Sequence, residues 1–192
     1  MKNINIIIGR FQPFTLGHLK CAQEAQKESG VPTVLCVIET TKQDARHPFL
    51  TTQIADTLDE MCKKEESLAG WVLVKSADIV KNAEILRNND FNPISWSCGT
   101  DRFSDYNRMA TRYKNDAGLD EDFRVIEVKR GDDDISATKA REALKSNDQK
   151  EYQKLVPKSW WNSFQKLREI IMSLDEEYGL KSLRNYLTES LL

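Results

Sequence analysis

The sequence predicts an α/β fold, a Rossmann-like parallel sheet with helices on both faces and further helices at the C-terminal end. Short apolar runs rich in β-branched residues alternate along the chain with longer segments whose apolar residues recur at helical spacing, which is the pattern of such folds. The chain has 192 residues, of which 40% are hydrophobic and 30% charged. It is therefore long enough and apolar enough to bury a core of its own.

The expected strands are short segments rich in apolar and β-branched residues, and the continuous apolar run at residues 33–38 predicts a strand that is buried on both faces. They cover residues 4–9, 33–38, 71–74, 94–98 and 123–128. Helices are expected between and after them. They cover residues 16–26 and 102–117, a segment capped by Thr51 or Thr52, a segment capped by Asp78, and a segment from about Ser136. Parallel strands bring their carboxyl ends to one edge, where ligands should bind.

The C-terminal part contains only helical patterns. Two helices are expected here, divided at Gly179, because glycine commonly ends a helix. The predicted organisation is a main domain of residues 1–156 and a helical appendage of residues 157–192, packed on that domain or on a partner subunit of a homo-oligomer. The tryptophans Trp96, Trp160 and Trp161 are expected to serve in packing.

Composition excludes several classes of protein. Lys and Arg total 28 against 30 for Asp and Glu, so there is no general positive field of the kind that binds nucleic acid. The apolar run at the start is too short for a signal peptide or a membrane span, which predicts a cytoplasmic protein with no membrane partner. Four scattered cysteines, with no spacing typical of zinc ligands, are expected to be reduced and buried.

The segment between the first strand and the first helix carries the strongest chemical signal. It reads GRFQPFTLGH over residues 9–18. Gly9 and Gly17 permit a ligand phosphate to approach the backbone, and the start of a helix attracts anions. On the simplest interpretation, Thr15 only caps the helix and His18 is an ordinary surface histidine.

A second segment follows the last strand and reads DISATKAR over residues 134–141. Its helix start would aim unpaired amides at phosphate oxygens, and Arg141, one turn on, could hold two oxygens with its planar guanidinium. The alternative is that Ser136 caps the helix and that Arg141 pairs with Asp134 or Glu142.

The two segments together resemble the nucleotidyltransferase superfamily, whose motifs are H/T-x-G-H and I-S-x-T-x-x-R. The form GRFQP is similar to the archaeal-type nicotinamide mononucleotide (NMN) adenylyltransferases and to phage-encoded nucleotidyltransferases. The resemblance covers about residues 4–157 and implies transfer of a nucleoside monophosphate from a nucleoside triphosphate to a small phosphate-bearing acceptor, with release of pyrophosphate and use of Mg²⁺. AMP transfer from ATP to NMN, giving NAD, is the specific expectation.

The resemblance also implies roles for individual residues. The implied catalytic residues are Thr15, His18, Lys42 and Arg141. The implied nucleotide-binding residues are Gly9, Arg10, Phe11, Gly17, Gly99, Asp101, Ser136, Ala137, Thr138 and Arg141. Asp101 follows a strand in a G-x-D segment that would lie beside the base and ribose, although it could simply cap the next helix. The acidic run 132–134 is expected to be a solvated loop, and no metal ligand is assigned.

The sequence departs from the NMN adenylyltransferase pattern at two places. Thr15 stands where many relatives have a histidine, and the helix after Lys42 begins TTQI without the Glu-Arg pair of the archaeal-type enzymes. A cytidylyltransferase or a pantetheine-phosphate adenylyltransferase therefore remains an alternative. A non-catalytic nucleotide-binding regulator or scaffold is the alternative of another class.

Overall fold

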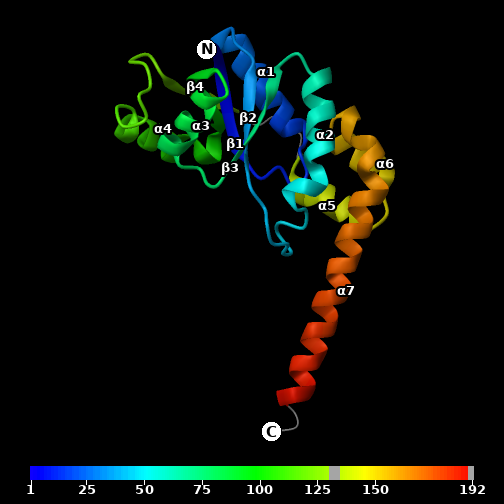
Figure 1. Cartoon of the computed structure of the whole chain (residues 1–192). Coiled ribbons are helices and arrows are strands. Elements are labelled where there is room, and N and C mark those ends of the chain that lie inside the picture. Colours follow the sequence, from blue (N-terminus) through cyan, green and yellow to red (C-terminus); the bar gives the residue numbers. More distant parts are fainter. Residues whose placement is uncertain (130–134, 190–192) are drawn as a thin grey trace.

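The computed structural model describes residues 1–129 and 135–189, and the side chains as far as residue 178. Its centre is a parallel sheet with helices around it (Figure 1), and the strand order of the sheet is β3-β2-β1-β4-β5. The strands are β1 Lys2–Gly9, β2 Thr33–Ile38, β3 Leu68–Val74, β4 Phe91–Gly99 and β5 Arg124–Val128. The chain order reverses beside β1, since β2 lies on one side and β4 on the other. In open α/β sheets a crevice for ligands forms at such a point, beyond the carboxyl ends of the strands.

Helices cover both faces of the sheet, as predicted. They are α1 Leu16–Ser29, α2 Thr51–Lys64, α3 Ile79–Asn88, α4 Thr100–Tyr113, α5 Ala137–Lys145, α6 Gln149–Leu155 and α7 Phe164–Glu189, with a 3₁₀ helix η1 Lys158–Ser163. Successive residues of β1 serve the two layers: Ile7 packs with α1, α2 and α5, whereas Ile6 and Ile8 pack with α3 and α4. Trp96 and Trp160 are fully buried, one in each layer, which confirms their role in packing.

A polar network lies inside the sheet, where the strands are otherwise apolar. Asn5 on β1 is fully buried. Its amide nitrogen donates to the Thr33 hydroxyl on β2 over 3.0 Å, and its amide oxygen accepts from the hydroxyls of Ser95 and Ser97 on β4 over 2.9 and 2.7 Å. A shift in the β1–β4 register at Ile4/Asn5 places Asn5 opposite Ser95. The amide therefore links the three central strands.

The helix boundaries correct two expectations. The residue capping α2 is Leu50, whereas Thr51 is the first helical residue and its hydroxyl accepts from the Thr40 amide over 2.8 Å. The expected break at Gly179 is absent, because α7 runs as one helix to Glu189. A single glycine inside a helix costs only about 1 kcal/mol relative to alanine, which a long helix tolerates.

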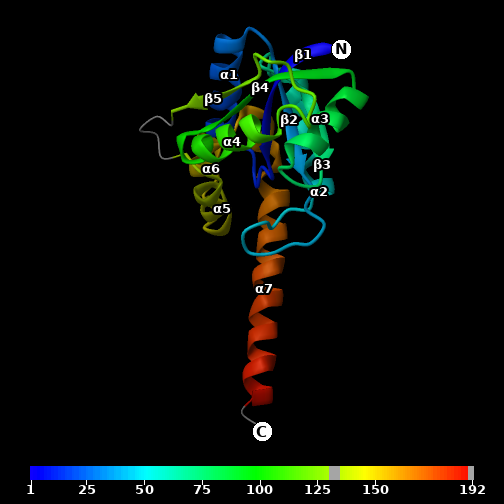
Figure 2. The same cartoon turned by 90° about the vertical axis from the view of Figure 1, so that its left-hand side faces the viewer.

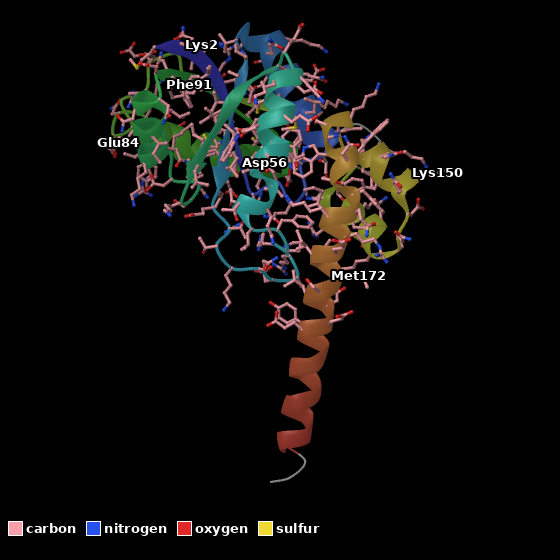
Figure 3. All side chains as sticks on the ribbon, turned by 45° about the vertical axis from the view of Figure 1, so that its right-hand side comes forward. Lys2, Asp56, Glu84, Phe91, Lys150 and Met172 are labelled. Carbon is pink, nitrogen blue, oxygen red and sulfur yellow. The ribbon has the colours of Figure 1, made fainter. Side chains whose placement is uncertain are left out.

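The C-terminal segment is partly in the core. Trp160, Phe164, Leu167 and Ile171 are buried in the layer formed by α1, α2 and α5. Beyond them α7 leaves the body of the molecule (Figure 2), and side chains fill the space between the sheet and the helices that cover it (Figure 3). Over the described part of the chain, no helix is long and apolar enough to cross a membrane.

Candidate active site

A hollow of about 610 Å³ lies at the carboxyl edge of the sheet. Its floor contains the ends of β1 and β4, the two strands between which the chain order reverses. Its walls contain the starts of α1, α4 and α5 and part of the loop after β2. The sequence segments singled out for chemistry therefore meet at one place, because each follows a strand of the same parallel sheet.

The turn after β1 is held in an uncommon conformation. Phe11 has a φ of 51°, in the left-handed region that non-glycine residues seldom occupy. The turn brings the Phe11 ring back over Gly9, where a β-carbon would lie 3.2 Å from the ring atom Cε1. A side chain at position 9 would therefore need the Phe11 ring to shift by a few tenths of an ångström. Although Phe11 is only 3% exposed, it forms part of the wall of the hollow.

Thr15 and His18 form a reciprocal cap at the start of α1. The His18 ring nitrogen Nδ1 accepts from the Thr15 backbone amide over 3.0 Å, and the Thr15 hydroxyl oxygen lies 3.0 Å from the same nitrogen. Because Nδ1 is an acceptor, the proton of the neutral imidazole belongs on Nε2. The rings of Phe11 and Phe14 lie against the imidazole, each 5.2 Å from it between centroids. The sequence therefore fixes both the orientation and the tautomer of His18.

The second motif begins α5 on the opposite wall. The Ser136 hydroxyl caps the helix by accepting from the Lys139 amide over 3.2 Å, as expected. Arg141, half-buried, donates from Nη1 to the backbone oxygen of Gln12 over 2.7 Å and from Nη2 to the Thr138 hydroxyl over 3.1 Å. Burial lowers the pKa of Arg141 from its ordinary value, but a guanidinium remains charged in a protein.

The two motifs are neighbours. A β-carbon placed on Gly17 of α1 would lie 3.6 Å from the backbone oxygen of Ile135, just before α5. Arg10, Thr15, Gly17 and His18 therefore face the same hollow as Ser136, Ala137 and Arg141. The alternative pairing of Arg141 with Asp134 lies outside the described residues.

The start of α4 forms a third wall. Gly99 is the capping residue of α4 and Asp101 lies in its first turn, so the alternative that Asp101 caps this helix is wrong. Both residues line the hollow, and the exposed Asp101 carboxylate lies 3.9 Å from Arg102 Nε. Tyr106, one turn after Arg102, also reaches the hollow and stacks on the buried Trp96 with centroids 4.0 Å apart. Tyr106 was not among the predicted residues, although its position four residues after Arg102 places both on one face of the helix.

The loop between β2 and α2, residues 39–50, contributes residues other than the expected one. Lys42 is exposed and is not part of the lining of the hollow, whereas Arg46 and His47 are. Asp44 holds this part of the loop, because its carboxylate accepts from the backbone amides of both Arg46 and His47 over 2.7 Å. No local pattern in the sequence distinguishes Arg46 from Lys42, so only the folded loop identifies it. Thr138 is likewise outside the lining and acts on it through Arg141.

Among the described residues, positively charged side chains predominate in the lining of the hollow. The Arg and Lys residues that line it are Arg10, Lys20, Arg46, Arg102, Lys129 and Arg141. Within the described part of the chain, the lining contains one carboxylate, that of Asp101. The whole chain has a net charge of −2, so the positive potential is local. A local concentration of cations beside two helix starts suits a small polyanion.

The described residues contain no cluster of three or more carboxylate, histidine or cysteine side chains suited to a metal ion. The acidic run 132–134 lies outside the described residues. All four cysteines are free thiols. Cys21, Cys36 and Cys98 are buried, as predicted, whereas Cys62 is only half-buried.

Comparisons with known proteins add independent findings. Residues 6–143 match the cytidylyltransferase-like family model, which is well over half of the chain. The chain is similar to a bifunctional NMN adenylyltransferase/ADP ribose pyrophosphatase from Francisella tularensis complexed with AMP and a Mn ion, with 21% identity and a TM-score of 0.59, covering 98% of this chain and 56% of that one. It therefore spans about half of that bifunctional protein.

Two further solved structures share the fold. A Plasmodium falciparum nicotinic acid mononucleotide adenylyltransferase complexed with APC is 13% identical, with a TM-score of 0.54 and coverage of 91% of this chain and 96% of that one. TmcAL from Thermotoga maritima, bound with alpha-thio ATP, is 14% identical, with a TM-score of 0.51 and coverage of 92% and 56%. No curated protein sequence matches the chain.

These likenesses agree with the parallel sheet flanked by helices. At such low identities the solved structures establish the fold, whereas the match over residues 6–143 establishes the family. The chain belongs to the cytidylyltransferase-like family and is a nucleotidyltransferase.

Proposed function

We propose that this protein transfers AMP from ATP to the phosphate of NMN, giving NAD and releasing pyrophosphate. The observation that carries the proposal is the convergence of two helix starts on one cationic hollow. The start of α1 brings His18 to it and the start of α5 brings Arg141, and the two are tied by the bond from Arg141 to Gln12. Such an arrangement suits a triphosphate.

The reaction needs no covalent intermediate on the protein. An oxygen of the acceptor phosphate attacks the α-phosphorus of ATP, a new P–O bond forms, and the bond to the β-phosphate breaks so that pyrophosphate leaves with its electron pair. The protein's contribution is to align the two substrates and to stabilise the charge that develops. Burial raises the pKa of the Cys98 thiol, which lines the hollow, from its ordinary 9.0 to about 11, so this thiol is not activated as a nucleophile.

Each wall of the hollow has a role in this proposal. His18, with its proton on Nε2, donates to the phosphate at the reacting centre, and Thr15 holds the imidazole in that tautomer. Arg141 and the backbone amides at Ser136 and Ala137 bind the β- and γ-phosphates. Gly99 and Asp101 lie on the side of β4, where the base and ribose would be placed.

The residues that the structure describes at this site fit a magnesium ion that is held mainly by the bound triphosphate. Asp101 is the one carboxylate that the described residues offer to the hollow, and Mg²⁺ commonly takes one or two carboxylates together with substrate phosphates. Bound there, the ion would neutralise charge on the departing pyrophosphate. We therefore expect Mg²⁺ to enter with ATP and not to occupy a separate protein cage.

Two observations favour an adenylyl donor and a pyridine nucleotide acceptor. Among the structures of this fold, the Francisella protein is named an NMN adenylyltransferase and is complexed with AMP, and the Plasmodium protein is a nicotinic acid mononucleotide adenylyltransferase. The GRFQP segment of this chain also resembles that group. The same site could accept another phosphate monoester, so the acceptor needs a direct test.

The test offers ATP and CTP separately with NMN, nicotinic acid mononucleotide, pantetheine phosphate and an alcohol phosphate, and measures pyrophosphate release with Mg²⁺ present. We expect ATP with NMN to give the highest kcat/KM and NAD to appear as product. Pyrophosphate release with CTP and an acceptor, but not with ATP and any acceptor, would establish a cytidylyltransferase. Tight ATP binding without pyrophosphate from any pair would instead establish a non-catalytic nucleotide-binding protein.

A further inference from the structure

The buried side chain of Gln12 joins the turn after β1 to the loop after β2. Gln12 is only 4% exposed. Its amide nitrogen donates to the Phe49 backbone oxygen over 2.7 Å and to the Thr40 hydroxyl over 3.3 Å, and its amide oxygen accepts from the Phe49 backbone amide over 2.9 Å. One side chain thus satisfies both backbone groups of a residue 37 positions away.

The loop that Gln12 holds is the one that brings Arg46 and His47 to the hollow. Thr40 and Phe49, the two partners of Gln12, stand near the two ends of residues 39–50. Bonds from Gln12 therefore close the base of the loop, while Asp44 organises its middle. The loop follows β2, on the far side of β1 from the start of α4.

The backbone of Gln12 serves the other side of the site. Its carbonyl oxygen accepts from Arg141, as described above. Gln12 is consequently the single residue that is bonded both to the loop of residues 39–50, through its side chain, and to the guanidinium at α5, through its backbone. This relation holds among the hydrogen bonds of the described residues.

We propose that Gln12 is a positioning residue that latches the loop of residues 39–50 onto the catalytic turn, so that Arg46 and His47 form the wall of the hollow that receives the acceptor. This inference rests on the proposed function, which places the nucleotide's base and ribose on the opposite wall, at α4. Gln12 acts through Arg46 and His47 and does not itself need to touch either substrate.

The first experiment separates the acceptor from the nucleotide. Gln12→Met keeps the length of the side chain and removes its hydrogen bonds. We expect the KM of the acceptor to rise roughly tenfold, a size typical of coupling within one hydrogen-bond network, while the KM of ATP changes less than about twofold. Arg46→Ala in the same background should add little, because an unlatched loop no longer presents Arg46. Fully additive losses, or an equal rise in both KM values, would overturn the proposal.

A matched variant controls for simple destabilisation. Asn82 is also a buried amide, 1% exposed, whose side chain donates to a loop carbonyl, that of Ser76 over 3.0 Å, but it lies outside the hollow. Asn82→Leu should lower the melting temperature by an amount comparable to Gln12→Met and leave the acceptor KM unchanged. If Asn82→Leu raised that KM equally, the effect of Gln12 would be one of stability alone.

A measurement without turnover separates this inference from the proposed function. In wild-type protein the Phe49 amide is bonded to the Gln12 side chain, so its hydrogen exchange should accelerate at least tenfold in Gln12→Met, whereas the Leu50 amide, bonded to Gln53 over 2.8 Å, should change much less. Unchanged exchange at Phe49 would refute the latch. If wild-type protein used another acceptor in the panel, the KM comparison would be made with that acceptor. If it used no acceptor, the proposed function would fail, but hydrogen exchange at Phe49 would still show whether Gln12 holds the loop.

Discussion

The guanidinium of Arg141 is fastened to the backbone of Gln12 by a 2.7 Å hydrogen bond, although the two residues are 129 positions apart. The bond joins the start of α5 to the turn before α1. It uses one nitrogen of a planar group that has five N–H donors, so further donors can serve a ligand. The geometry makes Arg141 a link between the two motifs as well as a cation in the hollow.

Replacement of Arg141 should therefore harm nucleotide use even when charge is kept. In Arg141→Lys a point charge replaces the guanidinium and cannot bond the Gln12 oxygen, the Thr138 hydroxyl and phosphate together. We expect kcat/KM for ATP to fall by about a hundred- to a thousand-fold, as for loss of one preorganised donor. Arg108→Ala is the control, because Arg108 pairs with Asp105 on the exposed side of α4. Steady-state kinetics with near-normal values for Arg141→Lys would contradict the assigned role.

His18 has a structural role and a chemical role that two substitutions can separate. His18→Gln keeps an acceptor for the Thr15 amide, since glutamine serves at this position of capping boxes, but it lacks the imidazole. His18→Ala loses both. We expect kcat to collapse in both variants, whereas only His18→Ala should lose about 1 kcal/mol of stability, equivalent to about 2–4 °C in melting temperature. The melting temperature and kcat of both variants are measured and compared with those of wild-type protein. Substantial turnover by His18→Gln would show that the imidazole has no part in the mechanism.

The buried Cys36 thiol should make the free energy of unfolding fall as the pH rises above 9. Burial raises the pKa of the Cys36 thiol from its ordinary 9.0 to about 12. The folded protein therefore keeps a proton that the unfolded chain loses above pH 9, so this contribution to stability is complete below pH 9 and falls as pH rises toward 12. We expect wild-type protein to lose about 1 kcal/mol more than Cys36→Ala between pH 9 and 10 in urea unfolding. Equal losses in the two proteins would show that the thiol does not titrate in this way.

The exposed part of α7 touches the same loop that Gln12 latches. The Tyr178 hydroxyl donates to the Gln43 backbone oxygen over 3.2 Å. Because a single exposed hydrogen bond contributes about 0.5–1.5 kcal/mol, Tyr178→Phe should raise the acceptor KM by no more than about tenfold, with kcat and the ATP KM unchanged. Tyr113→Phe, on α4, is the matched control. A change in the ATP KM alone would argue that α7 acts elsewhere.

The sequence allowed most of the sheet and its helices to be predicted, because the first two strands are nearly continuous apolar runs and the helices between the strands carry a clear spacing. The failures arose where tertiary contacts outweigh local signals. Thr51 resembles a cap, but its hydroxyl is bonded to the Thr40 amide. Gly179 resembles a helix end, but the helix that begins at Phe164 continues through it.

The candidate site could be predicted only where residues follow a strand directly. Gly9, His18 and Arg141 belong to motifs whose place at the sheet edge follows from the fold. Arg46 was missed because it lies in the middle of a loop whose course depends on bonds made by Gln12 and Asp44, and Lys42, chosen for its charge, is outside the hollow.

The amide of Asn5 has a consequence for how the sheet is assembled. Apolar strands are nearly interchangeable, since any alignment of them buries hydrocarbon, but only one alignment gives this side chain both a hydroxyl acceptor on β2 and hydroxyl donors on β4. A slip by one residue would turn neighbouring side chains to the opposite face and strand a polar group in the interior, at about 1–3 kcal/mol. The buried Asn5 amide therefore specifies the register of the three central strands by destabilising misaligned sheets.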